Sequence, residues 1–161
     1  MARVFIGIGS SINRKENIHF AIQTLQTEFG PLTCSAIYES EAVGFDGKNF
    51  YNLVLYFDSY LNVQEIIDKL KVIEIQQGRP KKTIKFAPRT IDLDLLLYDQ
   101  LINLKINLPR AEIVSNAFVL QPLSEIAPHL QHPILNTSYQ VLWEKFPKKQ
   151  QKLWKIDTIN H

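Results

Sequence analysis

The sequence predicts an α+β fold in which helices pack on an antiparallel sheet, and three observations lead to that prediction. The chain has 161 residues, 45% of them hydrophobic, which suffices for one compact domain with its own core. Short apolar runs typical of strands are separated by longer segments with the periodicity of helices. No internal repeat, low-complexity tract or linker interrupts them, so we expect a single domain over residues 1–161.

The first strand and the first helix are indicated by their ends as well as by their periodicity. An apolar run over residues 4–8 indicates a buried strand that stops at Gly9. Four apolar residues then recur at helical spacing: Ile18, Ile22, Leu25 and Phe29. Asn13 and Glu16 have the spacing of a capping box at the start of this helix, and Gly30 is expected to end it.

Two strands, a second helix and a fourth strand are expected to follow. Residues 32–38 and 51–57 are strand-like, and the segment between them is too long for a tight hairpin. Apolar residues over 63–73 indicate a helix that closes at Gly78, and residues 91–98 form the next strand. The order strand, helix, strand, strand, helix, strand is the split βαβ arrangement of the ferredoxin-like sandwich.

The last third of the chain gives weaker signals. We expect a short segment that ends at Asn116, an apolar stretch over residues 118–123 and a helix over 139–146. His129 and His132 are near neighbours, but prolines flank them on both sides. Because proline disfavours a helix that would place them on one face, we interpret both histidines as solvated surface residues rather than metal ligands.

Charge and cysteine content exclude several classes of protein. The net charge is only +2, which does not point to a general nucleic-acid or membrane-surface binder. A single cysteine, Cys34, excludes an internal disulfide and fits a reducing compartment. No run approaches a membrane span, and the N-terminal apolar run is too short for a signal peptide. We expect a cytoplasmic monomer with neither a membrane nor a nucleic-acid partner.

An acidic pair inside an apolar run is the strongest sign of function. Asp92 and Asp94 share one face of the expected strand, while Ile91, Leu93, Leu95 and Leu97 share the other. Same-face residues lie roughly 6 to 7 Å apart, so both carboxylates can serve one divalent metal or a close pair of metals. The preceding segment, residues 79–89, holds five cations and no acid. Together the two features indicate polyphosphate chemistry, although an internal ion-pair network with Arg89 is an alternative explanation of the acidic pair.

These residues resemble the defining motif of the 6-hydroxymethyl-7,8-dihydropterin pyrophosphokinase family. The motif covers residues 79–97, with Gly78-Arg79 at the start of the basic loop and residues 88–94 at its end, and three further segments agree in order: 6–10, 50–52 and 118–128. The resemblance extends over about residues 4–130. It implies the ferredoxin-like sandwich and the transfer of pyrophosphate from ATP to 6-hydroxymethyl-7,8-dihydropterin, with release of AMP, in folate synthesis.

The resemblance also implies roles for individual residues. Asp92 and Asp94 match the carboxylates that hold two Mg²⁺ ions between the ATP phosphates and the attacking hydroxyl. The cations that match those presented to the triphosphate are Arg79, Lys81, Lys85 and Arg89. The pterin site is expected at Ser40, Val43, Phe50, Asn52 and Phe118, with the two aromatic rings on either side of the pterin and the Asn52 amide at its edge. The nucleotide side is expected to include Lys71, Glu74, Leu95 and Arg110.

Departures from the family pattern leave alternatives open. Asn116 stands where members carry an arginine, and Arg110 is a candidate to supply that charge. Glu74 fits a solvated helix face as well as it fits a nucleotide site. One alternative function is a paralogue that acts on a modified pterin, or that binds pterin and nucleotide without turnover. Another is an RNA-binding module, which would need exposed aromatic residues where residues 51–57 predict core.

Overall fold

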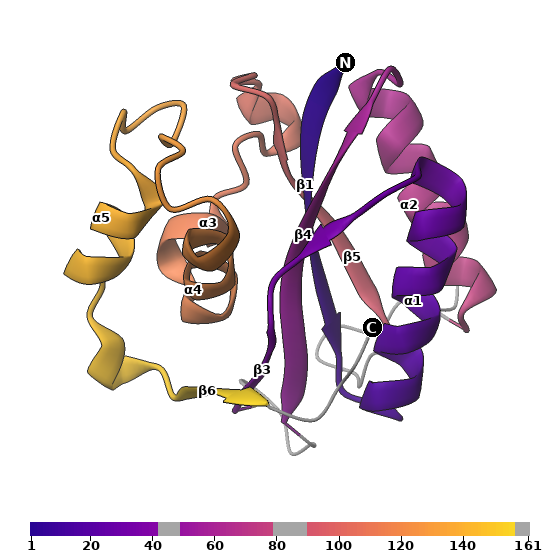
Figure 1. Ribbon diagram of the computed structural model, residues 1–161, viewed down its shortest axis with the longest axis horizontal. Coiled ribbons are helices and arrows are strands. Elements are labelled where there is room, and N and C mark those ends of the chain that lie inside the picture. Colours follow the sequence, from indigo (N-terminus) through magenta and orange to yellow (C-terminus); the bar gives the residue numbers. More distant parts are fainter. Residues whose placement is uncertain (42–48, 79–89, 157–161) are drawn as a thin grey trace.

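A computed structural model describes residues 1–41, 49–78 and 90–156 of the chain (Figure 1). Six antiparallel strands form one sheet in the order β5-β1-β4-β3-β6, and the short β2 also pairs with β4. The strands are β1 (Ala2–Ser10), β2 (Thr33–Cys34), β3 (Ile37–Ser40), β4 (Phe50–Ser59), β5 (Asp92–Tyr98) and β6 (Leu153–Ile156). The order β5-β1-β4-β3 is that of the split βαβ arrangement, so the predicted ferredoxin-like fold is confirmed.

Helices cover both faces of this sheet, as Figure 1 shows with α1 and α2 on one side and α3, α4 and α5 on the other. They are α1 (Arg14–Phe29), α2 (Val63–Gln76), α3 (Glu112–Ser115), α4 (Ala117–Ile126) and α5 (Tyr139–Lys145), with short 3-10 turns at Leu104–Ile106 and Lys148–Gln150. None of the helices described is long and apolar enough to cross a membrane. The apolar stretch over residues 118–123 lies within α4, and the helix expected over 139–146 is α5.

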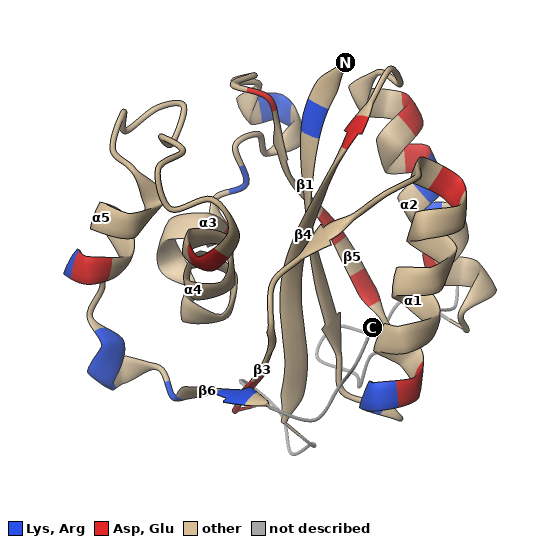
Figure 2. Cartoon of the chain, in the orientation of Figure 1, with Lys and Arg blue, Asp and Glu red and all other residues tan. Residues whose placement is uncertain are grey.

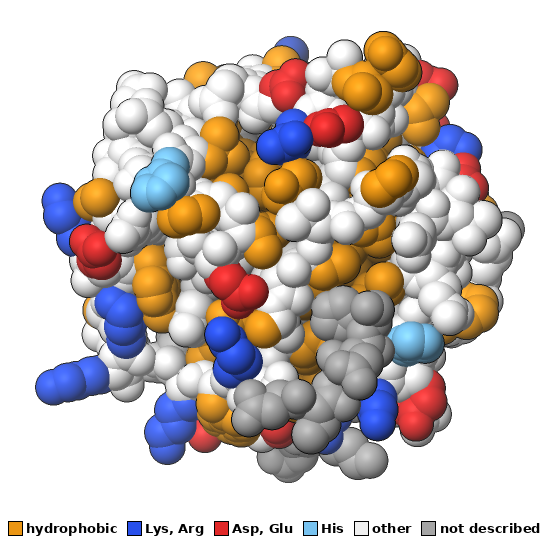
Figure 3. Space-filling model, viewed as in Figure 1, with side chains coloured by type: hydrophobic (Ala, Val, Ile, Leu, Met, Phe, Trp, Pro, Cys, Tyr) orange, Lys and Arg blue, Asp and Glu red, His pale blue; other side chains and the backbone are white. Residues whose placement is uncertain are grey.

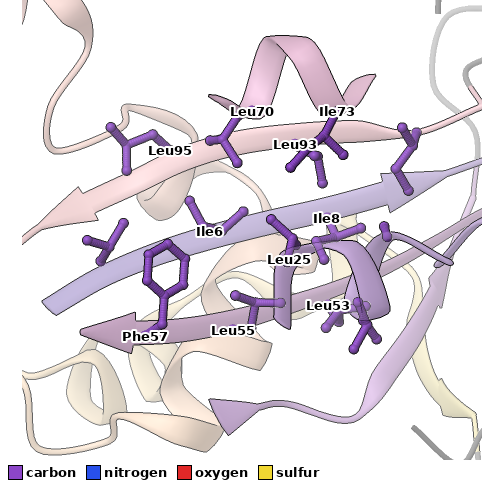
Figure 4. Packing of buried hydrophobic residues seen from close by; sticks show 14 of the residues in the cluster. Ile6, Ile8, Leu25, Leu53, Leu55, Phe57, Leu70, Ile73, Leu93 and Leu95 are labelled. Carbon is purple, nitrogen blue, oxygen red and sulfur yellow. The ribbon is translucent and has the colours of Figure 1, made fainter. Parts of the chain in front are cut away.

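Two hydrophobic clusters hold the layers together. The larger cluster lies between the sheet and helices α1 and α2, where Leu25, Leu70 and Ile73 point at strand residues such as Ile6 and Leu95 (Figure 4). The smaller cluster lies under α3, α4 and α5, with Phe5, Val54, Leu97 and Leu123 among its buried members. Strands β1 and β4 therefore send alternate side chains to the two clusters, which is why the sequence pattern shows these two strands clearly.

The predicted start of α1 is wrong in one respect. Asn13 precedes the helix but has a left-handed backbone, φ 40 and ψ 53, and its side chain makes no capping hydrogen bond. A cap residue normally needs an extended backbone to aim its side chain at the first turn, so the expected capping box with Glu16 does not form. A complete capping box with the same spacing is found at α2, between Asn62 and Glu65. Gly30, with φ 90, ends α1 as predicted.

The predicted alternation along β5 holds for only part of the strand. Register with β1 shifts between Ile6 and Phe5, so that Leu95 pairs with Ile6 and Leu97 pairs with Phe5. The additional residue is Leu96, and such a bulge reverses which face the following side chains meet. Leu97 is therefore in the smaller cluster and not beside Leu95, contrary to the prediction.

The end of the chain differs most from expectation. Residues 153–156 form β6, a strand that the sequence pattern does not predict, and it pairs with β3 from Ile37↔Ile156 to Ser40↔Leu153. His132 is 5% exposed, so its interpretation as a surface residue is wrong. Its Nδ1 accepts hydrogen bonds from the Ile134 and Leu135 N–H groups, 3.2 Å each, and burial lowers the pKa of the imidazole.

Candidate active site

Glycines form the floor of the candidate site, on the sheet face that α4 packs against. Gly9 of β1 lies between Asp92 of β5 and Asn52 of β4 in the strand register, and Gly7 lies beside Asp94 in the same way. Residues paired directly across strands project to the same face, so the carboxylates and the amide share it. Neighbouring strands are about 4.8 Å apart, so about 10 Å separates the backbones at Asp92 and Asn52 across the glycine.

Gly9 is required by the position of the Asn52 side chain. A Cβ atom at residue 9 would lie 2.9 Å from Asn52 Oδ1 and 3.9 Å from Phe50 Cδ1. At Gly7, by contrast, the nearest atom to an added Cβ would be Leu96 Cδ2 at 3.4 Å. The Asn52 amide therefore lies over the glycine strand, in the space between the acidic strand and its own.

The Asn52 amide is held in one orientation. Asn52 and Ser40 are both 6% exposed, and Asn52 Nδ2 donates to Ser40 Oγ at 2.9 Å. Ser40 pairs with Phe50 in the β3–β4 ladder, so the hydroxyl, the amide and the Phe50 ring lie close together on this face. The structure thus brings together three of the five predicted pterin-binding residues, whereas Val43 lies outside the described residues.

Phe118 reaches this face from a different element. It lies in the first turn of α4, is partly exposed and packs against the smaller hydrophobic cluster. The other end of α4 is fixed to the sheet by Glu125, which accepts from Tyr38 OH at 2.5 Å and from the Ala36 N–H at 2.9 Å. Burial and this carboxylate raise the pKa of the Tyr38 hydroxyl, which keeps it in its donating form.

The acidic strand is anchored by a buried carboxylate. Asp92 and Asp94 are partly exposed, whereas Glu74 on α2 is 8% exposed and its Oε2 accepts from the Leu93 N–H at 2.8 Å. Leu93 stands between the two aspartates on the edge strand of the sheet. The alternative that Glu74 is a solvated helix residue is therefore wrong, because its carboxylate fixes the backbone that carries the acidic pair. Figure 2 shows the acidic residues of β5 on an otherwise uncharged strand.

Arg110 joins the acidic side of the site. Its Nη2 lies 3.4 Å from Asp94 Oδ1, its Nε lies 3.2 Å from Glu112 Oε2, and its N–H donates to the Leu96 carbonyl at 3.0 Å. The Arg110 side chain is 28% exposed and that of Asp94 is 45% exposed. Arg110 therefore neutralises part of the acidic pair, a contact that sequence spacing did not reveal because the two residues come from different elements.

The remaining predicted residues are more dispersed. Lys71 is exposed on α2, and the Leu95 side chain is buried in the larger cluster, so only the backbone of Leu95 is available to a ligand. Asn116 precedes α4 and its side chain does not cap the helix. The expected triphosphate-binding cations, Arg79, Lys81, Lys85 and Arg89, lie outside the described residues.

The donor set on β5 fits magnesium. In the part of the chain that the structure describes, no three His, Cys, Asp or Glu side chains are grouped to hold a metal by themselves. Mg²⁺ does not need such a cage, since it usually takes one or two carboxylates and completes its shell with water and substrate phosphates. Asp92 and Asp94 on one face of an edge strand supply that kind of site.

The β4 stripe of Tyr51, Leu53, Leu55 and Phe57 does not form the exposed aromatic surface that an RNA-binding module would need. Leu53, Leu55 and Phe57 are at most 2% exposed and belong to the larger cluster, and Tyr51 packs against it. Arg14 also lies over the Tyr51 ring, 4.1 Å from its centroid. This stripe is core, as the sequence indicated.

Comparisons with known proteins identify the family of the chain. The family model described as 7,8-dihydro-6-hydroxymethylpterin-pyrophosphokinase matches residues 5–128. A protein of Aquifex aeolicus named 2-amino-4-hydroxy-6-hydroxymethyldihydropteridine pyrophosphokinase is 39% identical over 138 residues, which cover 83% of this chain and 86% of the relative. A protein of Pseudomonas aeruginosa with the same name is 34% identical over 137 residues, covering 81% and 84%.

Solved structures agree in fold. A crystal structure of the A437G variant of Plasmodium falciparum HPPK-DHPS superposes with a TM-score of 0.70 at 13% identity. The match covers 89% of this chain but 45% of the Plasmodium chain, so this chain spans less than half of that protein. At this identity the likeness concerns the fold alone.

Proposed function

Because the chain belongs to the 7,8-dihydro-6-hydroxymethylpterin-pyrophosphokinase family, we infer that the sheet face around Gly9 is its active site. The protein transfers pyrophosphate from ATP, its co-substrate, to 6-hydroxymethyl-7,8-dihydropterin in folate biosynthesis. The observation that carries the assignment of the site is the row Asp92, Gly9 and Asn52, in which an acidic strand and a buried amide flank a strand without side chains.

In the proposed complex the pterin lies flat between Phe50 and Phe118. Aromatic rings give a flat heterocycle a large contact area at little entropic cost. The Asn52 carboxamide offers a donor and an acceptor, and its hydrogen bond to Ser40 directs Nδ2 away from the glycine and leaves Oδ1 above it. The pterin's hydroxymethyl group then extends over Gly9 toward the acidic strand.

The acidic strand is proposed to bind two Mg²⁺ ions through Asp92 and Asp94. When bound, such ions neutralise charge on the phosphates of ATP and polarise the attacking hydroxyl. The protein's own task is to hold the two carboxylates at fixed positions, and the Glu74 contact with the Leu93 N–H does this. Burial of Glu74 makes that support rigid.

Arg110 is proposed to change partners during binding. In the structure it contacts Asp94, and its guanidinium suits bidentate binding of phosphate oxygens. When metal takes Asp94, Arg110 can turn to the nucleotide while Glu112 keeps hold of its Nε. Lys71, Glu74 and the Leu95 backbone complete the proposed nucleotide side, and Arg79, Lys81, Lys85 and Arg89 are proposed to bind the triphosphate.

We propose further that residues 1–161 are one domain that acts as a cytoplasmic monomer without a nucleic-acid partner. In support, one sheet joins β1 near the start to β6 near the end of the described chain, and the net charge is only +2. Burial raises the pKa of the Cys34 thiol to about 11, which keeps it protonated and unreactive at neutral pH.

Product analysis tests the reaction. The protein is incubated with ATP, Mg²⁺ and 6-hydroxymethyl-7,8-dihydropterin, and nucleotide and pterin products are separated by chromatography. The proposal predicts AMP and pterin pyrophosphate in equal amounts, and no AMP when pterin is omitted. ADP as the nucleotide product would exclude pyrophosphoryl transfer, and pterin binding without any product would favour a non-catalytic binding protein. Turnover only with a modified pterin would indicate a paralogue.

A further inference from the structure

The start of α4 is capped from a distant part of the chain. Asn116 occupies the position that normally caps a helix, but its side chain makes no capping bond. Gln151 takes over one part of that task, because its Oε1 accepts from the Ala117 N–H at 2.8 Å and its Nε2 donates to the Ser115 carbonyl at 2.8 Å. One carboxamide therefore binds backbone groups on both sides of Asn116, immediately before Phe118.

The residues after Gln151 hold the opposite wall of the same site. Leu153 pairs with Ser40, the first of four pairs between β6 and β3. Ser40 in turn accepts the hydrogen bond that orients Asn52. The segment 151–156 thus contacts the α4 side through Gln151 and the β3 side through its strand.

We propose that residues 151–156 act as a clamp that sets the spacing of the two walls of the pterin site, with Gln151 as a positioning residue for Phe118. The inference rests on the proposed function, because it assumes that Phe118 and Asn52 bind pterin. The segment lies beyond residues 5–128, the part of the chain that the family model matches.

Gln151 is an uncharged residue among several lysines. Figure 3 shows basic side chains along the left and lower left of the molecule, the side where Figure 1 places α5 and the segment that leads to β6. Three lysines flank Gln151 in the sequence: Lys148, Lys149 and Lys152. A lysine at 151 could not accept the Ala117 N–H, whereas a carboxamide can accept and donate at once.

Ligand binding to matched variants tests the clamp. Gln151→Met keeps the length of the side chain and removes both hydrogen bonds, Gln151→Glu keeps the acceptor for the Ala117 N–H, and Gln150→Met alters the exposed neighbour. Each full-length variant is titrated by calorimetry with 6-hydroxymethylpterin and, separately, with a non-hydrolysable ATP analogue and Mg²⁺. Steady-state kinetics and the thermal midpoint complete the set.

We expect Gln151→Met to weaken pterin binding about tenfold and to raise the pterin KM by a similar factor, since two hydrogen bonds to a half-buried helix start are lost. Binding of the ATP analogue and kcat at saturating pterin should stay within about twofold, as expected for a loss of ground-state binding. Gln151→Glu should recover part of the pterin affinity, and Gln150→Met should match the natural protein.

Unchanged pterin affinity in Gln151→Met would overturn the clamp, as would an equal loss of affinity for both ligands accompanied by a lower thermal midpoint. Failure of the natural protein to bind pterin would instead overturn the proposed pterin site itself. The two failures are distinguishable because the second is seen before any substitution is made.

Discussion

Replacing Arg110 with alanine should change metal and nucleotide binding in opposite directions. In the structure the guanidinium lies 3.4 Å from Asp94 Oδ1, so it competes with a metal ion for the charge of this carboxylate. Coulomb's law at this separation gives about 1 kcal/mol in water and about 5 kcal/mol at an effective dielectric constant of about 20. Both side chains are partly exposed, so we take the lower figure, which corresponds to about a fivefold change.

We therefore expect Arg110→Ala to bind Mg²⁺ about fivefold more tightly in the absence of nucleotide. The same variant should bind an ATP analogue about tenfold more weakly, because a charge-assisted hydrogen bond to phosphate is lost. Calorimetric titration of each ligand separately gives both constants. Arg3→Ala is a matched control, since Arg3 forms an ion pair with Asp58 that is not part of the site.

A loss of affinity for both ligands would mean that Arg110 only stabilises the local fold. No change in either would show that the contact with Asp94 has no role in binding. In both cases the proposed exchange of partners is refuted, and the charge lacking at Asn116 would have no replacement at Arg110.

Three other substitutions test Gly9, Phe118 and His132. Gly9→Ala should weaken pterin binding about tenfold, because its Cβ would lie 2.9 Å from the Asn52 amide oxygen. Gly7→Ala, whose Cβ would lie 3.4 Å from its nearest neighbour, should have little effect on pterin binding. Equal effects of the two substitutions in calorimetry would contradict the role of Gly9. Phe118→Ala should weaken pterin binding by at least about 1 kcal/mol and leave ATP binding unchanged, and equal weakening of both would identify Phe118 as core. Burial lowers the pKa of His132, so the stability that it contributes is complete above its unfolded pKa of about 6.5 and is lost as the pH falls toward its folded pKa. Denaturant titrations at pH 7 and pH 5 should therefore show a smaller loss of unfolding free energy in His132→Gln than in the natural protein. An equal loss would exclude His132 as the cause.

The sequence predicted the parts of the fold that depend on local periodicity. Alternation on β1, β4 and the start of β5 shows directly which face each residue meets, and this placed Asp92 and Asp94 together correctly. The pattern could not show the shift beyond Leu95, because a bulge depends on how β1 and β5 pair and leaves no mark on either sequence alone. For the same reason β6 was missed, since four residues of mixed polarity become a strand only by pairing with β3.

In the candidate site, too, local patterns were predictable from the sequence and long-range contacts were not. Residue spacing identified the acidic strand, and the family resemblance pointed to the Asn52 amide, but the supporting contacts join residues distant in sequence. Glu74 reaches Leu93 across 19 positions, and Gln151 reaches Ala117 across 34. The Asn13 capping box failed for a local reason, because that residue has a left-handed backbone that spacing alone does not reveal.

In the proposed site Asp92 and Asp94 serve the chemical step, while Asn52, across Gly9, serves pterin binding. Steady-state kinetics of Asp94→Asn and Asn52→Ala beside the natural protein test it most directly, with Asp68→Asn on the exposed face of α2 as control. We predict that Asp94→Asn lowers kcat by at least about a hundredfold, or 2 to 3 kcal/mol, because charge neutralisation in the transition state is lost. Asn52→Ala should mainly raise the pterin KM. A near-natural kcat for Asp94→Asn at saturating Mg²⁺ would exclude Asp94 from the chemical step.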